Sequence, residues 1–186
     1  RVSGSLIELR ADSLEFTNEE TRELLVTRER LALGQEEIDV LLERTEGWPA
    51  ALVLAGMWLK NVDDPAAAVR EFHGDHRFVA DYLSAELFAA LESGRRTIFL
   101  TVAILGRFTA DLCDAVLGRD DSASVLAELE KENLMVQGLE RGGWYRVHPL
   151  LTEFARAQLA VEDPDGAAAI DRRAARWLRD RGLIMD

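Results

Sequence analysis

The side chains best suited to acid–base or metal chemistry are three histidines and one cysteine. His73 and His76 lie three residues apart, but they flank a Gly-Asp helix start and lack the His-Glu-x-x-His helix of zinc peptidases. The acidic run Arg119–Ser122 lacks the spacing of a calcium loop, and no Gly-x-Ser-x-Gly nucleophile elbow occurs. The sequence therefore predicts no metal site, no catalytic residues and a protein that is not an enzyme.

Two chain corners carry residues of a different kind. His148 immediately precedes Pro149, and Gly47-Trp48-Pro49 separates two helical patterns. Proline suits a first helical turn because its φ is already helical and its missing N–H would have no partner there. An imidazole on such a corner can donate a hydrogen bond to phosphate, and a proline ring can cover an apolar face. The alternatives stay open: a capping or packing histidine at His148, and core packing at Trp48.

Cys113 is the only cysteine, so it forms no disulfide within the chain. It shares one face of a predicted helix with Leu112, Val116 and Leu117, which favours buried packing over reactivity. A chain without a disulfide fits a reducing compartment. With no signal peptide and no membrane span in the sequence, we expect a cytoplasmic location.

The first half of the sequence predicts a strand at Leu6–Leu9 followed by helices. Thr17-Asn-Glu-Glu20 has the form of a capping box, which starts a helix that runs to about Arg28. The run after Pro49 is apolar on every side, so we expect that helix, to about Lys60, to be buried all round. Further helices are expected at 38–47, 64–72 and 75–91. We interpret residues 18–92 as one helical domain.

The second half predicts a winged helix over residues 93–161, after a boundary at Glu92–Arg95. Three short helices precede two strands, Leu134–Gln137 and Trp144–Val147, joined by a turn around Gly142 and Gly143. A helix begins at Pro149, a loop follows at 162–166, and an amphipathic helix spans 167–181. We interpret 162–186 as the first helix of a C-terminal helical-repeat region. The predicted fold class is mainly α: a helical domain followed by a winged helix with one β-hairpin.

The formal net charge of −12 opposes contact with nucleic acid, which binds proteins mainly through Lys and Arg. The predicted third helix of the winged helix and its lead-in, Asp120–Glu132, hold five carboxylates against a single lysine. This helix enters the major groove in many winged helices. The sequence therefore predicts that this module does not bind DNA directly.

Three segments, Thr45–Ala55, Phe99–Ala115 and Trp144–Arg156, together resemble the large LuxR-type transcriptional regulators of the MalT kind. Members of that family are signal-transduction ATPases built from five parts. Along the chain these are a nucleotide domain, a helical domain, a winged helix, a helical-repeat sensor and a DNA-binding tail. The resemblance covers nearly the whole chain in one collinear order. It implies an internal segment, consistent with the absent initiator Met and the absent Gly-x-x-x-x-Gly-Lys-Ser/Thr. Residues 1–17 would then be the tail of an upstream nucleotide-binding domain.

The resemblance also implies site residues. In this wider family a winged-helix histidine reaches the β-phosphate of ADP in the closed, inactive state, and His148 matches by position, although Val147-His148-Pro149 differs from the better-known Met-His-Asp form. A Gly-x-Pro turn lies against adenine there, which Gly47-Trp48-Pro49 matches. Pro49, His148 and Trp48 are thus the implied cofactor-binding residues. ADP or ATP would bind only with the nucleotide-binding domain present, and the isolated segment would hold no cofactor.

The implied function is a regulatory segment that senses the nucleotide state and switches an ATP-dependent LuxR-family transcriptional regulator. Its partners would be the upstream nucleotide-binding domain and the downstream helical-repeat sensor of the same chain, with no direct nucleic acid and no membrane. Two alternatives come from other classes of protein. One is an acidic protein-interaction module without nucleotide contact, and the other is a DNA-binding winged helix.

Overall fold

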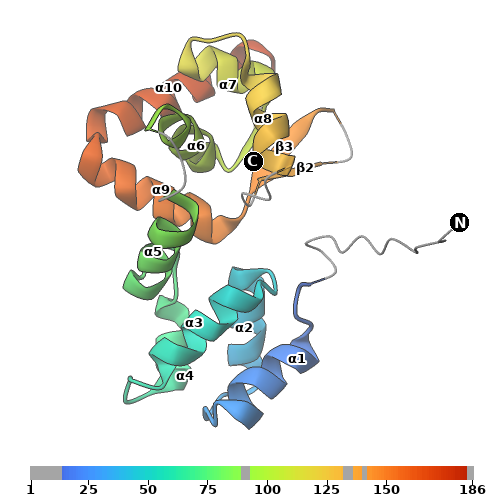
Figure 1. Ribbon diagram of the computed structural model, residues 1–186, viewed down its shortest axis with the longest axis vertical. Helices are drawn as coiled ribbons and strands as arrows, with labels where there is room; N and C mark the ends of the chain where they lie inside the picture. Colours follow the sequence, from blue (N-terminus) through green and yellow to red (C-terminus); the bar gives the residue numbers. More distant parts are fainter. Residues whose placement is uncertain (1–13, 89–92, 132–135, 140–141, 184–186) are drawn as a thin grey trace, which may run out of the picture. The chain divides into compact units, whose positions relative to one another are not determined.

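The computed structural model describes residues 14–88, 93–131, 136–139 and 142–183. The chain forms two compact units, Arg1–Phe72 and His73–Asp186. Figure 1 shows the first unit in blue to blue-green and the second in green to red. The predicted strand at Leu6–Leu9 lies outside the described residues. Helices dominate the described part of both units, and a small antiparallel sheet lies in the second, which confirms the predicted fold class.

The first unit begins with the predicted capping box. The backbone N–H of Glu20 donates to the Thr17 hydroxyl at 3.3 Å, and the Thr17 N–H donates to the Glu20 carboxylate at 2.9 Å. The bond from the Thr17 N–H, together with one that the Thr17 hydroxyl donates to the same carboxylate at 2.8 Å, favours the ionised form and lowers the pKa of Glu20. Helix α1 (Asn18–Arg22) continues into a π-helical turn, η2 (Glu23–Arg28), which ends where the sequence predicted.

Helix α2 (Gln35–Thr45) buries Ile38 and Leu41 and ends in a left-handed corner. Glu46 and Gly47 have φ of 48° and 74°, and helix α3 (Pro49–Leu59) starts two residues later. The Gly47 carbonyl accepts from the N–H of Phe16 at 2.7 Å. A Cβ on Gly47 would lie 2.6 Å from the Phe16 carbonyl oxygen, so this approach requires glycine.

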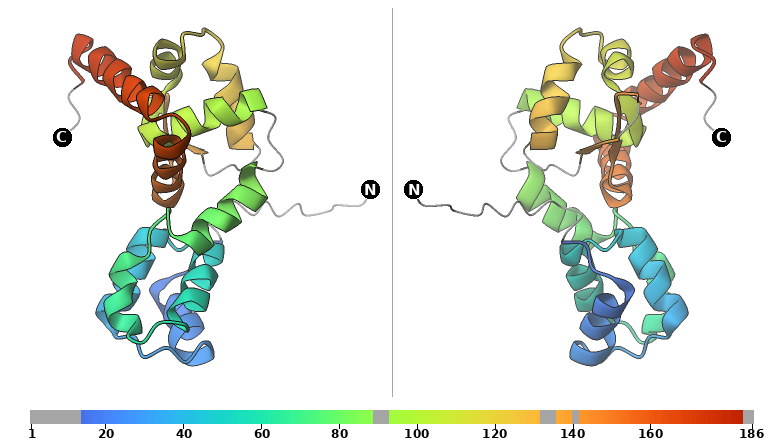
Figure 2. Two further views of the ribbon diagram at one scale, coloured as in Figure 1. Left: turned by 90° about the vertical axis from the view of Figure 1, so that its left-hand side faces the viewer. Right: turned by 90° about the vertical axis from the view of Figure 1, so that its right-hand side faces the viewer.

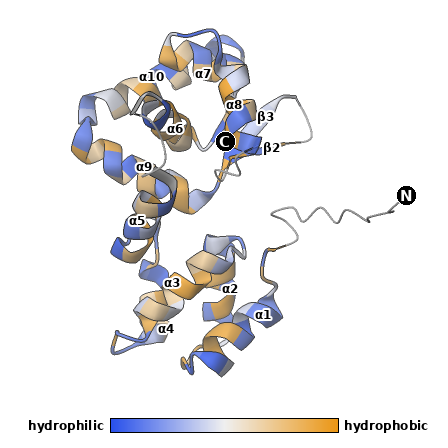
Figure 3. Cartoon of the chain, in the orientation of Figure 1, coloured by the Kyte–Doolittle hydropathy of each residue, from blue (hydrophilic) through white to orange (hydrophobic). Residues whose placement is uncertain are grey.

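Helix α3 is not buried all round, contrary to the prediction from its composition. Ala51, Leu52, Ala55 and Leu59 are fully buried, whereas the side chains of Val53 and Met57 are 47% and 51% exposed. Figure 3 shows α3 in mainly hydrophobic colours. Val53 and Met57 stand one helical turn apart, so the helix presents an apolar face that the described part of the first unit leaves exposed.

The first unit closes with α4 (Pro65–Ala68) and a 3₁₀ turn, η3 (Val69–Glu71). Asp64 caps α4 by accepting from the N–H of Ala67 at 3.1 Å. The guanidinium of Arg44 donates to the carbonyls of Arg70 at 3.1 Å and of Phe72 at 3.2 Å. These bonds satisfy carbonyls at the end of a helical segment, which have no partner within the segment itself.

The second unit opens with α5 (Arg77–Leu83) and a π-helical turn, η4 (Ser84–Phe88). Three helices of the predicted winged helix follow: α6 (Ser93–Leu105), α7 (Ala110–Leu117) and α8 (Ser122–Lys131). Their buried side chains form one core with those of α9 (Pro149–Glu162). The largest fully buried members of this core are Phe99, Phe108 and Phe154. Figure 2 shows these helices from two sides.

The wing is a three-stranded sheet rather than a two-stranded hairpin. Strand β3 (Trp144–Val147) pairs with β2 (Val136–Gly138) on one side and with β1 (Arg107–Thr109) on the other. Of the predicted partner strand Leu134–Gln137, Val136 and Gln137 pair with β3 as expected, and β2 continues to Gly138. Leu134 and Met135 lie outside the described residues. Gly142 and Gly143 have φ of 77° and 67°, as a tight hairpin turn requires. Strand β1 was not predicted because three residues show no readable alternation.

Helix α10 (Pro164–Asp180) begins earlier than predicted. The loop expected at 162–166 reduces to Asp163, whose carboxylate accepts from the N–H of Gly166 at 2.9 Å. With Pro164 at the first helical position, this cap starts the helix at once. Within the second unit, Arg173 of α10 donates to the Val116 carbonyl at 2.7 Å, which fastens α10 to α7.

The predicted domain ranges 1–17, 18–92, 93–161 and 162–186 remain predictions. Residues 1–13 and Glu92, the first residue of the expected boundary Glu92–Arg95, lie outside the described residues, whereas Ser93–Arg95 belong to α6. The compact units divide after Phe72, so α5 belongs with the winged helix as a packing unit. Helix α5 contacts α9, which accounts for this grouping.

Candidate functional site

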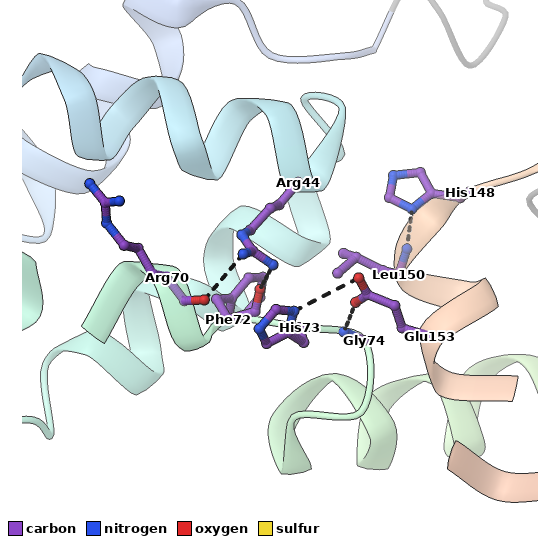
Figure 4. A network of polar contacts seen from close by, with 8 residues as sticks. All are labelled: Arg44, Arg70, Phe72, His73, Gly74, His148, Leu150 and Glu153. Atoms are coloured by element: carbon purple, nitrogen blue, oxygen red, sulfur yellow. Dashed lines mark hydrogen bonds and ion pairs between the residues drawn. The ribbon is translucent and has the colours of Figure 1, made fainter. Parts of the chain in front are cut away.

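His148 occupies the corner between β3 and α9, as the sequence predicted. It is the N-cap residue of α9, and its Nδ1 atom accepts a hydrogen bond from the backbone N–H of Leu150 at 3.2 Å. Figure 4 shows the imidazole above the first turn of α9. Its side chain is half-buried, and Pro149 beside it is exposed. The structure therefore supports the capping alternative for His148, because its Nδ1 atom caps α9.

The cap determines how the ring can act on a ligand. A nitrogen that accepts a hydrogen bond carries no proton, so a neutral His148 has its N–H at Nε2. Nε2 is then the ring's only donor atom. Because Val147 pairs with Val136 and Pro149 starts a helix, the backbone on both sides of the ring is held. The arrangement suits donation of one oriented hydrogen bond to an acceptor such as a phosphate oxygen.

A second polar network lies close to the same helix end, and no pattern in the sequence predicted it. The carboxylate of Glu153 accepts from the backbone N–H of Gly74 at 2.6 Å and lies 3.8 Å from Nδ1 of His73. Gly74 is buried against the Leu150 backbone, where a Cβ would collide with the Leu150 carbonyl. Figure 4 shows Glu153, His73 and Gly74 together with Leu150. Glu153 thereby joins the segment before α5 to α9.

Trp48 and Pro49 form the other predicted corner, in the first unit. The N–H of Trp48 donates to the Thr45 carbonyl at 2.8 Å, and Pro49 is the first residue of α3. Both side chains are half-buried, so Trp48 is not a fully enclosed core residue. Pro49 precedes the exposed Val53 by one helical turn. The proline ring therefore lies on the side of α3 that carries its exposed apolar side chains.

The three predicted cofactor-binding residues divide between the units. Trp48 and Pro49 are neighbours in the first unit, and His148 belongs to the second.

Helix α8 carries the acidic side chains that the sequence placed there. Glu128 is exposed and lies 3.9 Å from Arg95, and Glu130 accepts from the backbone N–H of Gly138 at 3.0 Å. In the lead-in, a hydrogen bond from Arg119 lowers the pKa of Asp121. This surface therefore stays negative at neutral pH.

Cys113 is fully buried in α7, in agreement with its predicted packing role. Burial, with a smaller contribution from the Asp114 charge, raises the pKa of its thiol to about 12. Such a thiol carries almost no thiolate at neutral pH. No group of three metal-binding side chains occurs among the described residues. His73, one of the two histidines considered as metal ligands, lies against the Glu153 carboxylate. Within the same ranges no helix has the length and apolarity needed to span a bilayer.

Part of the chain is similar to a known protein family. Residues 84–167 match the family model of the MalT winged helix domain. This match covers α6 to α9 with their sheet, which is the region built as a winged helix in the structure.

Similar curated proteins align over most of the chain. The HTH-type transcriptional regulator MalT of Vibrio cholerae is 29% identical over 96% of the chain, and that of Klebsiella pneumoniae is 28% identical over 89%. The serine/threonine-protein kinase PknK of Mycobacterium tuberculosis is 27% identical over 99%. The aligned part is 20%, 19% and 17% of these relatives, so the chain spans about a fifth of their length. The chain thus resembles the MalT-like transcriptional regulators over most of its length, and its residues 84–167 match the model of the MalT winged helix domain.

Proposed function

We propose that this chain is the part of an ATP-dependent LuxR-family transcriptional regulator that senses the bound nucleotide and switches between two states. The MalT-type winged helix supports a role in transcriptional regulation. The observation that carries the finer proposal is the capped imidazole of His148, which directs one donor, Nε2–H, from a held corner. In this role the chain regulates and does not catalyse.

The mechanism rests on a contact made in only one state. In the resting state Nε2–H of His148 donates to a phosphate of ADP held by an upstream nucleotide-binding domain. A ligand biases two states only through contacts that differ between them. A hydrogen bond to a charged group contributes about 1.5–3 kcal/mol, so this contact favours the closed state on the order of tenfold or more.

Pro49 supplies the second half of the proposed site. Its ring stands at the start of α3, beside an apolar face that includes Val53 and Met57, both about half exposed. Such a face can lie against a purine without competing for its hydrogen bonds. The helical domain would travel with the nucleotide in both states, so Pro49 contributes to affinity more than to switching. Trp48 supports the turn that presents Pro49.

The cap and the proposed phosphate contact of His148 can be separated by substitution. His148→Ala removes both. His148→Asp keeps an N-cap acceptor, since aspartate is among the best N-cap residues, but places a negative charge toward phosphate. In the longer protein that includes the nucleotide-binding domain, we expect both variants to weaken ADP binding and to raise activity without inducer. Pro49→Ala should weaken ADP binding with little change in basal activity.

Calorimetric ADP titration and a promoter-reporter assay without inducer measure these two effects. Thermal unfolding of the same variants reports the cap, which His148→Asp retains. Wild-type ADP affinity in a folded His148→Asp variant would contradict the proposal and leave His148 as a capping residue only.

The acidic surface favours one other candidate function, a protein-interaction module without nucleotide contact. The net charge of −12 supports it, and the carboxylates of α8 disfavour a DNA-binding winged helix. That candidate predicts unchanged ADP affinity in every variant above. The same titration therefore distinguishes the two functions.

A further inference from the structure

The backbone of Leu150 is held from two sides at the start of α9. On one side its N–H donates to Nδ1 of His148 at 3.2 Å. On the other side lies Gly74, where a Cβ atom would stand 2.6 Å from the carbonyl carbon of Leu150 and 2.9 Å from its Cα. Figure 4 shows Leu150 between these two residues. A shift of the Leu150 backbone therefore changes the geometry of the His148 cap.

Glu153 keeps Gly74 in this place. Its carboxylate accepts from the Gly74 N–H at 2.6 Å and lies 3.8 Å from Nδ1 of His73. Glu153 follows Leu150 by three residues in α9, so the two side chains lie on one side of the helix. The helix that presents the Leu150 N–H thus also holds the segment that packs against Leu150. We call Gly74, Leu150 and Glu153 the glycine clamp.

The cap of His148 is sensitive to small displacements. Hydrogen bonds from N–H to oxygen in proteins span about 2.7–3.2 Å, and the bond from Leu150 to Nδ1, at 3.2 Å, is as long as the longest of these. Withdrawal of the Leu150 N–H would leave Nδ1 able to carry the ring proton itself. Part of the molecules would then have no N–H at Nε2. The position of Leu150 therefore decides which ring nitrogen of His148 is a donor.

We propose that Gly74 and Glu153 are positioning residues for His148. By holding Leu150, they keep the neutral imidazole in the form that carries its proton at Nε2. This inference rests on the proposed function, because that function uses Nε2–H as the donor to phosphate. It adds a means of regulation, since the donor depends on the segment His73–Gly74, which directly follows the end of the first compact unit at Phe72.

A purely structural role of the clamp makes a different prediction. In that case Gly74 and Glu153 contribute to the free energy of unfolding, and the cap of His148 persists in every molecule that is folded. The tautomer of His148 would then be the same in all folded variants. The tautomer therefore separates a positioning role from a structural one, which a measurement of stability alone does not.

Proton–nitrogen NMR correlation spectra of the isotope-labelled chain, recorded about two pH units above the ordinary histidine pKa, report the tautomer of each neutral imidazole. The chain has three histidines, and the signals absent from His148→Asp belong to His148. We expect the Nε2–H tautomer at His148 in the original chain. Gly74→Ala and Glu153→Ala should each raise the share of the Nδ1–H tautomer several-fold. Glu153→Gln, which keeps an acceptor oxygen for Gly74, should resemble the original chain.

Three variants control for the substitutions themselves, and all three should keep the original tautomer. Gly94→Ala in α6 adds the same methyl group where no atom lies within 4 Å of it. Glu162→Ala removes a different carboxylate of α9, one that pairs with Arg96 at 3.0 Å. Val116→Ala removes part of a buried side chain of α7 and so lowers stability through a different helix.

An unchanged tautomer in folded Gly74→Ala and Glu153→Ala would overturn the inference. An equal change in Val116→Ala would also overturn it, because the tautomer would then follow overall stability. If Gly74→Ala does not fold, as judged by circular dichroism, the comparison of Glu153→Ala with Glu153→Gln decides.

ADP titration of Glu153→Ala in the longer protein distinguishes this inference from the proposed function. We expect weaker ADP binding, with recovery in Glu153→Gln. A changed tautomer with unchanged ADP affinity would support the clamp and contradict the phosphate contact of His148. An unchanged tautomer would contradict the clamp whatever the ADP affinity.

Discussion

The carboxylate of Glu153 in α9 accepts a hydrogen bond from the backbone N–H of Gly74 at 2.6 Å, across 79 residues of sequence. Gly74 lies so close to Leu150 that a Cβ atom at position 74 would collide with the Leu150 carbonyl oxygen. Only glycine fits this position. The two residues together hold the entry to α5 against the first turns of α9, directly beside the His148 cap. This contact supports the helix that positions the proposed sensor.

Gly74→Ala should destabilise the second unit, because the added Cβ collides with the backbone of Leu150, which cannot rotate away. Overpacking of this kind costs about 1–3 kcal/mol. Urea unfolding measures the loss. Gly94→Ala in α6 is the matched control, since no atom lies within 4 Å of its Cβ, and alanine there should be neutral or stabilising. Equal effects at the two glycines would contradict the close packing at Gly74.

Glu153→Ala should lower stability by about 1–3 kcal/mol, because it leaves the half-enclosed Gly74 N–H without its acceptor. Glu153→Gln keeps an acceptor oxygen and should recover most of the loss. The control is Glu162→Ala, which breaks the exposed pair with Arg96 and should cost no more than about 1 kcal/mol. If Glu153→Gln lowered stability as much as Glu153→Ala, the charge of Glu153, and not its hydrogen bond to Gly74, would account for most of its contribution to stability.

Gly47→Ala should destabilise the first unit for two reasons, its left-handed φ of 74° and the approach of its Cβ to within 2.6 Å of the Phe16 carbonyl. Gly118→Ala separates them, because Gly118 has φ of 69° and no atom within 4 Å of its Cβ. We expect about 1–2 kcal/mol for the backbone strain alone and a larger loss at Gly47. Thermal unfolding followed by circular dichroism compares the two variants.

The Cys113 thiol should react with a disulfide reagent at neutral pH at least a hundredfold more slowly in the folded chain than in urea. Burial raises its pKa from 9.0 to about 12, which removes the reactive thiolate, and it also blocks access. Fast reaction in the folded chain would show that α7 opens readily. Absorbance of the released thiol measures both rates.

The same raised pKa predicts a loss of stability at alkaline pH. Between pH 9 and 12 the unfolded chain loses the thiol proton while the folded chain keeps it, so the unfolded state binds fewer protons and the free energy of unfolding falls as pH rises. The fall attributable to Cys113 approaches about 1.4 kcal/mol per pH unit. Cys113→Ala should show a shallower pH dependence over this range. Parallel curves for the two proteins would contradict the assignment.

Features that depend on neighbours in sequence were predictable. The Thr17–Glu20 capping box, the start of α3 at Pro49 and the hairpin turn at Gly142 and Gly143 each follow from the conformational preferences of two to four adjacent residues. Helical periodicity then identified the helices of the winged helix, with errors at their ends. The corner position of His148 followed from the same local pattern.

Features that depend on distant residues were decided only by the tertiary structure. Strand β1 exists because its three residues pair with β3. The exposure of Val53 and Met57 on α3 depends on which described segments of the first unit pack against that helix. The carboxylate of Glu153 gains its role from Gly74, which no spacing in the sequence connects to it. Strand pairing and burial depend on contacts between segments that are distant in sequence. A single sequence specifies local backbone preferences far more directly than it specifies such contacts.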